Sequence, residues 1–476
     1  MALSRRQVLG YGALAGSGLL AGCGRLATRY AETSWPAQSA APDSQAKRWM
    51  NRTGFGPRPG DYELLVKEGF DVSREKLLAA SEPESIAATL ALRRLEPYST
   101  SESELESEPY NFVAEQLRQG YLIHATSGSN QLLERMVDFW SNHFNIYFIK
   151  ANLRYRKGTD EMQVIRQHAL GNFVDMVTAS AKSPAMLEYL DNAASVKGHP
   201  NENYARELLE LHTLGVHGGY TQQDVMEAAR CFTGWTIEKR FLHRRGEFMF
   251  DAERHDSGAK FVLGHHIPAG GGEEDGLAVI RLAALHPSTA DHLAGKLCAC
   301  FLGDSSHPMR TQVAKAFLDS KGDIKATLRP LLDPRLLAQS KPVAKRPLDY
   351  VVSAVRCLGG STDGAALHQH LANMGQPLYE WPLPDGYPVS AEAWTGSMLA
   401  RWNFVAAMMA GEIKGTQFDK SELHLRLGGD PGKSVRHVLG KEPQPGEPLV
   451  VELEKLGSDS VAHVGLCMAS PEFQWR

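Results

Sequence analysis

Residues 201–215 read Asn201-Glu-Asn-Tyr-Ala-Arg-Glu-Leu-Leu-Glu-Leu-His-Thr-Leu-Gly215. At about 100° per residue, this stretch forms two opposite helix faces. The polar face carries Asn203, Arg206, Glu207 and Glu210, and the apolar face carries Ala205, Leu208, Leu209 and His212. Apolar residues three and four positions apart are typical of an amphipathic α-helix. The stretch therefore predicts a helix that packs one face against a core.

The same spacing recurs along most of the chain. It predicts helices over 62–69, 73–80, 84–94, 109–127, 129–147, 160–179, 202–215, 222–232, 276–285, 287–302, 309–319, 323–331, 343–358, 364–373, 396–413, 431–439 and 449–456. Residues 235–266 alternate instead, around Gly246 and Gly258. A Ser- and Glu-rich segment at 97–109 predicts a solvated excursion without core-forming residues. The predicted fold class is mainly α, a large multi-helical domain with a small β-hairpin excursion near 235–266.

The N-terminus, residues 1–23, predicts a twin-arginine lipoprotein signal peptide. Arg5-Arg6 precede a short stretch of Gly, Ala, Leu and Ser, which is too short and glycine-rich to rest as a membrane helix. Leu20-Ala-Gly-Cys23 then places small residues before a cysteine. We therefore expect cleavage before Cys23, lipidation of its thiol and anchoring to a membrane.

The residues after Cys23 divide into a tether over 24–45, rich in Ala, Ser, Pro and Gln, and a helical domain over 46–476. The segment around Cys23 resembles that of bacterial lipoproteins, in which an aspartate after the cysteine favours retention at the inner membrane. Gly24 stands at that position, so the resemblance implies the periplasmic face of the outer membrane or the cell surface. Removal of residues 1–22 changes the formal net charge from −4 to −6. This acidic balance argues against a nucleic-acid partner.

The polar face of 201–215 supplies the first candidate site. If it faces solvent, it is an ordinary charged surface with Arg206 paired to Glu210. If it faces inward, Glu207 and Glu210 are candidates for acid/base catalysis or for binding a divalent metal ion, with Asn203 as a binding residue. His212 lies on the apolar face, which favours a core imidazole hydrogen-bonded to the backbone over a metal ligand. The sequence leaves the orientation of the polar face open.

His143 is the second candidate, because Trp140, Asn142 and Asn145 surround it with stacking and polar groups. We expect His143 and Arg206 to orient a substrate. The alternative for His143 is an aromatic-rich helix end. No further ligand lies at metal-site spacing, so the identity of any metal stays unknown. Signatures of the common hydrolases and of di-iron proteins are absent from the sequence.

A loop at 375–388, rich in proline, carries Tyr379, Trp381 and Tyr387. Exposed aromatic rings on a rigid loop suit the binding of carbohydrate or peptide by stacking. The alternative, which the general burial of aromatic residues favours, is that these rings pack the loop onto helices. Five cysteines follow Cys23, and this odd number leaves at least one without an intramolecular disulfide.

Several motifs together resemble one bacterial family, called domain of unknown function 1800. They are 51–60, 136–144, 201–215, 218–221, 232–235, 255–260, 374–378 and 470–474, and they run in order from about residue 46 to the end. The resemblance implies a mainly helical, exported protein, often sent by the twin-arginine route. It brings no settled activity.

Two functions follow as hypotheses. The first is an envelope hydrolase with a carboxylate and histidine site at Glu207, Glu210 and His143. The second is a non-catalytic envelope protein that presents the aromatic loop to a polysaccharide or to a partner protein. Burial of the polar face of 201–215 distinguishes the two hypotheses. If this face is exposed to solvent, the hydrolase hypothesis with these residues is wrong.

Overall fold

The computed structural model describes residues 45–476 except 81–83, 85, 96, 98–101 and 239–245. The expected signal peptide, Cys23 and all but the last residue of the tether therefore lie outside the described residues. Within them the fold is mainly helical, as predicted, and its strands form three small antiparallel pairs. No helix of this described part is both long and apolar enough to cross a bilayer.

The first half of the chain contains α2 to α13, with π- and 3-10 turns labelled η. The bounds are α2 Gln45–Thr53, α3 Asp61–Glu68, α4 Phe70–Ala79, α5 Ile86–Leu92, α6 Glu102–Leu105, α7 Tyr110–Ser127, α8 Gln131–His143, α9 Leu153–Thr159, η2 Asp160–Arg166, α10 Phe173–Lys182, α11 Pro184–Tyr189, η3 Asn192–Ala194, α12 Glu202–Glu207, η4 Leu208–His212 and α13 Gln222–Cys231.

The second half contains α14 to α25. The bounds are α14 Glu273–Ala284, α15 Pro287–Leu302, α16 Met309–Asp319, α17 Ile324–Leu328, η5 Arg329–Leu331, α18 Pro334–Gln339, α19 Pro347–Cys357, α20 Leu367–Asn373, η6 Ala391–Ser397, α21 Met398–Ala410, α22 Lys420–Leu427, α23 Pro431–Leu439, α24 Pro448–Glu454, α25 Ser460–Ala469 and η7 Glu472–Gln474.

The predicted β excursion is confirmed, but it consists of two hairpins. Strand β1 (Trp235–Ile237) pairs with β2 (Phe248–Phe250), and β3 (Lys260–Val262) pairs with β4 (His265–Ile267). The second turn falls at Leu263-Gly264 and not at Gly258, because Gly264 adopts a positive φ of 78°. A third pair, β5 (Ser361–Thr362) with β6 (Thr416–Gln417), links two distant loops.

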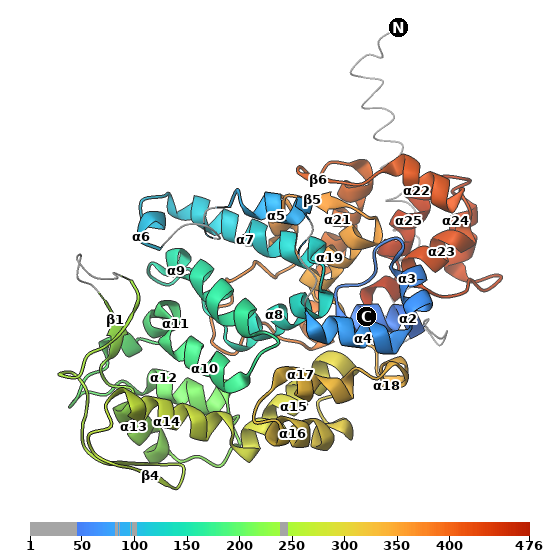
Figure 1. The fold of residues 1–476 in the computed structure, drawn as a ribbon. Helices are drawn as coiled ribbons and strands as arrows, with labels where there is room; N and C mark the ends of the chain where they lie inside the picture. Colours follow the sequence, from blue (N-terminus) through green and yellow to red (C-terminus); the bar gives the residue numbers. More distant parts are fainter. Residues whose placement is uncertain (1–44, 81–83, 85, 96, 98–101, 239–245) are drawn as a thin grey trace.

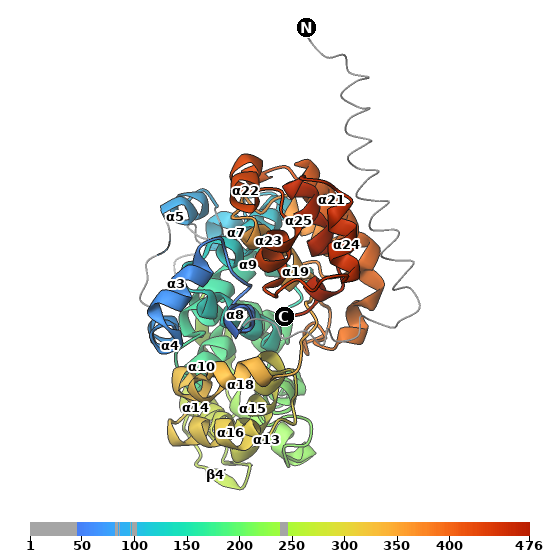
Figure 2. The ribbon, with the colours of Figure 1, turned by 90° about the vertical axis from the view of Figure 1, so that its right-hand side faces the viewer.

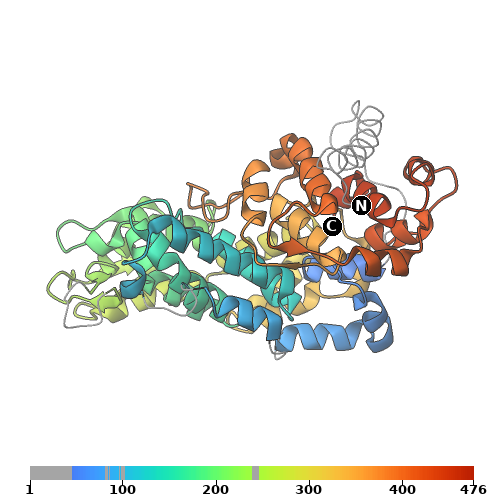
Figure 3. The same ribbon diagram turned by 90° about the horizontal axis from the view of Figure 1, so that it is seen from above.

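The chain is arranged so that its two halves meet in the middle of the molecule. In Figures 1 and 3 the green segment, with α10 to α14, lies at one end, and the orange and red C-terminal helices lie at the other. Between them α7 packs on α19, and α2 packs on both α15 and α18. The C-terminus lies in this central region (Figure 2). There Trp475 forms a backbone bridge with Ala344. One main hydrophobic core extends through the described part of the molecule and includes residues from Trp49 to Phe473.

Two further predicted features differ from the structure. The predicted helix 160–179 is divided, because the chain turns at Gly171 and α10 starts afresh where the Asn172 side chain caps the amide of Val174. The segment 97–109 does contribute to packing, contrary to the prediction. It forms α6, in which Leu105 is 1% exposed and Glu102 forms an ion pair with Arg156 at 3.0 Å.

Glu102 gives the first testable prediction. Burial raises its pKa from 4.5 to about 7, against the opposing effect of Arg156. Over that pH window the folded protein keeps a proton that the unfolded chain releases, so Glu102 lowers stability as the pH rises, by about 3 kcal/mol in all. We expect Glu102→Gln to gain stability relative to the wild type between pH 5 and pH 8. Urea unfolding at both pH values measures this, with the exposed neighbour Glu104→Gln as the control. An identical pH dependence in wild type and Glu102→Gln would contradict the assignment.

Candidate functional site

A pocket of about 570 Å³ lies between α8, α15 and the end of the chain. Asp138, Phe139 and Asn142 of α8 form one wall. The other walls come from α15, from 342–346 and from Trp475 and Arg476. The chain end is held there because Arg476 and Val343 exchange backbone hydrogen bonds of 2.9 and 3.0 Å. The pocket therefore joins segments that are far apart in the sequence.

Helix α15 presents two different faces. Leu293, Leu297 and Phe301 are buried in the core, at most 2% exposed. The neighbouring face lines the pocket with His292, Lys296 and Cys300, at intervals of one helical turn, and with the small residues Gly295, Ala299 and Gly303. The small side chains leave room for the pocket, and the larger polar side chains line it.

Lys296 contacts His143, the last residue of α8. Its Nζ donates to Nδ1 of His143 at 2.7 Å, and Nε2 of the same ring donates to the carbonyl of His212 at 3.0 Å. Because a carbonyl can only accept, the hydrogen of the neutral ring is on Nε2, and Nδ1 is free to accept from lysine. Both ring nitrogens of His143 are thus occupied, and the ring is only 2% exposed.

The pKa values of this cluster are strongly shifted. Burial lowers the pKa of Lys296 to about 8, although the carboxylate of Asp385 raises it. Burial and then the charge of Lys296 lower the pKa of His143 well below its ordinary value. The same two causes lower the pKa of His212 to about 3 and that of His292 to about 4. At neutral pH the cluster therefore holds one cation, Lys296, among neutral imidazoles.

His212 is buried, as its place on the apolar face predicted, at 1% exposure. The expected hydrogen bond to the backbone is not made by Nε2 of the ring, which has no hydrogen-bond partner within the described chain. The carbonyl of His212 is available to His143 because the helix of 201–215 changes at Leu208 into the π-turn η4, which releases backbone groups from the regular pattern.

The polar face of 201–215 is half-buried, and its members divide between two environments. Arg206 pairs with Glu202 at 2.9 Å and not with Glu210, so the predicted pair is wrong. Glu210 accepts instead from the hydroxyl of Tyr220 at 3.3 Å. Asn203 donates to the Leu190 carbonyl at 3.3 Å. Arg206 thus belongs to a surface network.

Glu207 is the member of this face with a shifted pKa. Burial and then the negative charge of Glu210 raise its pKa, and Asp385 adds to the effect. Asp385 therefore lies within electrostatic range of both Glu207 and Lys296. His143 reaches neither carboxylate by a hydrogen bond found among the described residues. Glu207 and Lys296 thus share one electrostatic neighbour, Asp385 of the proline-rich loop.

The loop 375–388 is fastened to the end of α8. The side chain of Asn142 donates to the carbonyl of Tyr387 at 3.1 Å and accepts from its amide at 2.7 Å. Asn145 donates to the carbonyls of Trp381 and Leu383 at 2.9 and 2.7 Å. A Cβ at Gly386 would collide with the Asn142 carbonyl. These amides position the loop, and with it Asp385, beside the pocket.

The aromatic rings of this loop mostly pack inward. Tyr379 and Tyr387 are only 7% and 8% exposed, and Trp381 is half-buried with its indole nitrogen donating to Asp385 at 3.0 Å. The expected exposed stacking platform is therefore not formed by Tyr379 and Tyr387, because their rings pack against Phe148 and Trp381.

One group of side chains in the described part has the geometry to hold a metal ion. It consists of Glu84, His124 and Glu134, whose ligand atoms lie within 4.8 Å of one another. Both carboxylate oxygens of Glu134 already accept from Arg166, at 2.6 and 2.8 Å. This cation occupies the carboxylate that a metal would need, so an ion-pair network fits the arrangement better.

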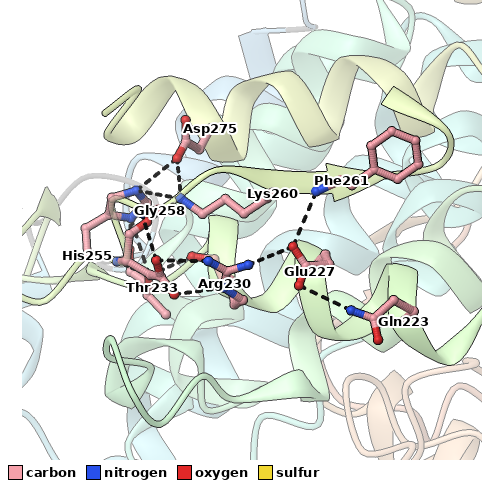
Figure 4. Close-up of polar contacts among 10 residues, drawn as sticks. Gln223, Glu227, Arg230, Thr233, His255, Gly258, Lys260, Phe261 and Asp275 are labelled. Carbon is pink, nitrogen blue, oxygen red and sulfur yellow. Dashed lines mark hydrogen bonds and ion pairs between the residues drawn. The ribbon is translucent and has the colours of Figure 1, made fainter. Parts of the chain in front are cut away.

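A second polar cluster lies between β3 and α14. Figure 4 shows Lys260 and His255 turned toward Asp275, whose Oδ2 lies 2.5 Å from Lys260 Nζ and 3.1 Å from His255 Nε2. Nδ1 of His255 contacts the carbonyl of Thr233 at 2.8 Å. All three charged or polar side chains are at most 4% exposed. They are engaged with one another and with the backbone, so the cluster joins the hairpin to the helices.

This second cluster gives a stability prediction. Asp275→Asn leaves the ammonium of Lys260 buried without its counter-charge, which costs about 3–5 kcal/mol of unfolding free energy. Chemical denaturation measures the loss. Glu274→Gln is the control, because the Glu274 side chain is 60% exposed on the same helix. A loss below about 1 kcal/mol would contradict the role given to Asp275.

Lys296 was missed by the sequence reasoning, although a signal was present. It lies in Leu293-Ala-Gly-Lys-Leu-Cys-Ala-Cys-Phe-Leu302, where a lone lysine interrupts an otherwise apolar helix. Lys296 is partly buried, and lysine is rarely removed from water unless it is paired or functional. The same stretch contains two cysteines, of which Cys298 is buried and Cys300 is partly exposed to the pocket. All five cysteines after Cys23 are unbridged.

Comparison with known proteins gives one finding. A family model described as protein of unknown function (DUF1800) matches residues 48–475, which confirms the resemblance of the sequence motifs. No curated protein and no solved structure matches the chain.

Proposed function

Because the chain belongs to the DUF1800 family of proteins of unknown function, no activity comes with membership, and we propose one from the site. We propose that the protein is an envelope enzyme, a hydrolase. Its acid is Lys296 of the pocket beside α15, and its base is Glu207, which does not line the pocket but shares the electrostatic neighbour Asp385 with Lys296.

The observation that carries this proposal is the 2.7 Å contact between Lys296 and the buried His143. A lysine with a pKa of about 8 is protonated at neutral pH but gives up its proton at a small free-energy cost. Hydrolysis requires one group that protonates the leaving group and another that activates water. Lys296 has the properties of the first group.

His143 acts here as a positioning residue. Its neutral ring holds the ammonium of Lys296 through Nδ1, and its own orientation is fixed by the carbonyl of His212. Glu207 supplies the base, since it is half-buried and the charges of Glu210 and Asp385 keep its affinity for protons high. Arg206 and Asn203 are not among the residues that line the pocket.

We also propose that the enzyme acts at a membrane surface of the cell envelope, held by lipid on Cys23. The support is the order of Arg5-Arg6, a short apolar segment and Leu20-Ala-Gly-Cys23. Gly24 supports the outer membrane over the inner one. The expected partners are a polysaccharide or an envelope protein, and the acidic balance argues against nucleic acid.

The proposal is tested by incubating the purified full-length protein with envelope polysaccharides, peptides and ester substrates and identifying products by mass spectrometry. Product formation is expected with wild type and with Lys315→Met, a control on the neighbouring helix whose side chain is 72% exposed. Lys296→Met and Glu207→Gln are expected to lose it. Turnover retained by both of these variants would overturn the proposal. Metal analysis of the same preparations tests whether a divalent ion accompanies the activity.

A further inference from the structure

The lining of the pocket is rich in arginine. Arg310, Arg346 and Arg476 line it, and we call them the arginine end; Arg310 also contacts both carboxylate oxygens of Asp291. Two further guanidiniums lie behind it, because Arg135 is 1% exposed and Arg52 is 0% exposed, and both lie within electrostatic range of Arg476. Such burial is unusual for arginine without matching negative charge.

The carboxylates present do not match this charge. Asp349 lies 2.6 Å from Arg135, 3.3 Å from Arg346 and 3.5 Å from Arg476. Asp138 also pairs with Arg346. Two buried side-chain carboxylates and the α-carboxylate of Arg476 thus face four buried guanidiniums, those of Arg52, Arg135, Arg346 and Arg476. Lys296 adds a further cation in the same pocket.

Arg52 shows the imbalance most clearly. One of its amino groups donates to the carbonyl of Lys341, next to the pocket-lining Pro342. Its Nε and its other amino group have no hydrogen-bond partner within the described chain, although the side chain is fully buried. Burial and the charges of Arg476, Arg48 and Arg135 lower its pKa well below the ordinary value. A buried guanidinium with free donors among other cations favours an anion nearby.

We propose that the arginine end binds an anionic group of the substrate, a carboxylate, sulfate or phosphate. The volume of about 570 Å³ is sufficient for such a group together with one sugar or residue-sized body. Arginine forks suit the oxygens of all three groups. That the ligand is the substrate rests on the proposed function, and the binding of an anion does not.

The test is a calorimetric titration of the full-length protein, in chloride-free buffer, with sulfate, phosphate and glucuronate. We expect at least one of them to bind, and their relative affinities distinguish a tetrahedral anion from a carboxylate. Arg476→Met and Arg310→Met should weaken that binding by about tenfold or more. The control Arg329→Met, a surface arginine paired with Glu75, should bind like the wild type.

Binding that is absent in the wild type, or equal in all variants, would overturn the proposal. Because Arg476→Met also removes a partner of Asp349, anomalous scattering from selenate soaked into wild-type crystals gives a second readout, and selenate located elsewhere would also overturn it. Glu207→Gln separates the two proposals. This variant should lose turnover and keep anion binding. If the hydrolase proposal fails, the anion site can still be correct. If the anion site fails, the roles of Lys296 and Glu207 can still be correct.

Discussion

Lys296→Met is expected to lower kcat by about 10²–10⁴-fold, the usual contribution of a positioned acid or base. Methionine has a similar length and fits a partly apolar wall, so the pocket keeps its shape while the proton donor is lost. The wild-type rate should also fall as the pH rises through about 8, because the ammonium of Lys296 then loses its proton.

The same substitution should make the protein more stable. Because burial lowers the pKa of Lys296, holding its charge at neutral pH costs free energy, and its removal should raise the free energy of unfolding by about 1–3 kcal/mol. A gain in stability with a loss of turnover separates a functional lysine from a structural one. Lys315→Met is the control for both measurements. Loss of turnover together with loss of stability would contradict the role given to Lys296.

His143→Gln tests the positioning role within the same prediction. Glutamine can still accept a hydrogen bond from Lys296, but it does not reproduce the fixed ring held by His212. We expect kcat to fall with little change in KM, and the alkaline limb of the pH profile to move. An unchanged pH profile would show that His143 does not act through Lys296.

Cys23→Ser is expected to remove the lipid and with it the stable attachment to the membrane. Serine lacks the thiol that accepts the lipid, and a protein without two acyl chains or an equivalent second signal binds a bilayer only marginally. Metabolic labelling with palmitate should mark the wild type and Cys300→Ser, the control, and leave Cys23→Ser unlabelled. Mass spectrometry of the N-terminal peptide should find the acyl groups on Cys23. Label in Cys23→Ser would contradict the assignment.

Export is tested separately from lipidation. Replacement of both Arg5 and Arg6 by lysine should hold the protein inside the cell, because the twin-arginine receptor reads the arginine pair. Cell fractionation followed by immunoblotting measures the distribution. Normal export of the double variant would indicate a different export route. The lipidation of Cys23 would still be tested by the palmitate labelling.

The sequence predicted local structure well, because local structure depends on neighbouring residues. The bounds of α15 and α16 agree with the predicted 287–302 and 309–319, since apolar spacing and end signals such as Pro287 are contained within the segment. The motifs from 51–60 to 470–474 were sufficient for the family, which the match over 48–475 confirms. The turn at Leu263-Gly264 was missed because Gly258 offered a similar turn nearby. The break near Gly171 was missed because the apolar spacing continues on both sides of it.

The sequence by itself determined a helical fold and a family, and it predicts a location in the cell envelope. Only the tertiary structure brought His143 to Lys296 and placed Arg346 and Arg476 at the same pocket. Helical periodicity states which face is apolar, but it does not state which distant segment covers the other face. The chemical properties of Lys296 and Arg476 depend on partners that lie more than a hundred residues away in the sequence. Those partners come close only in the packed molecule.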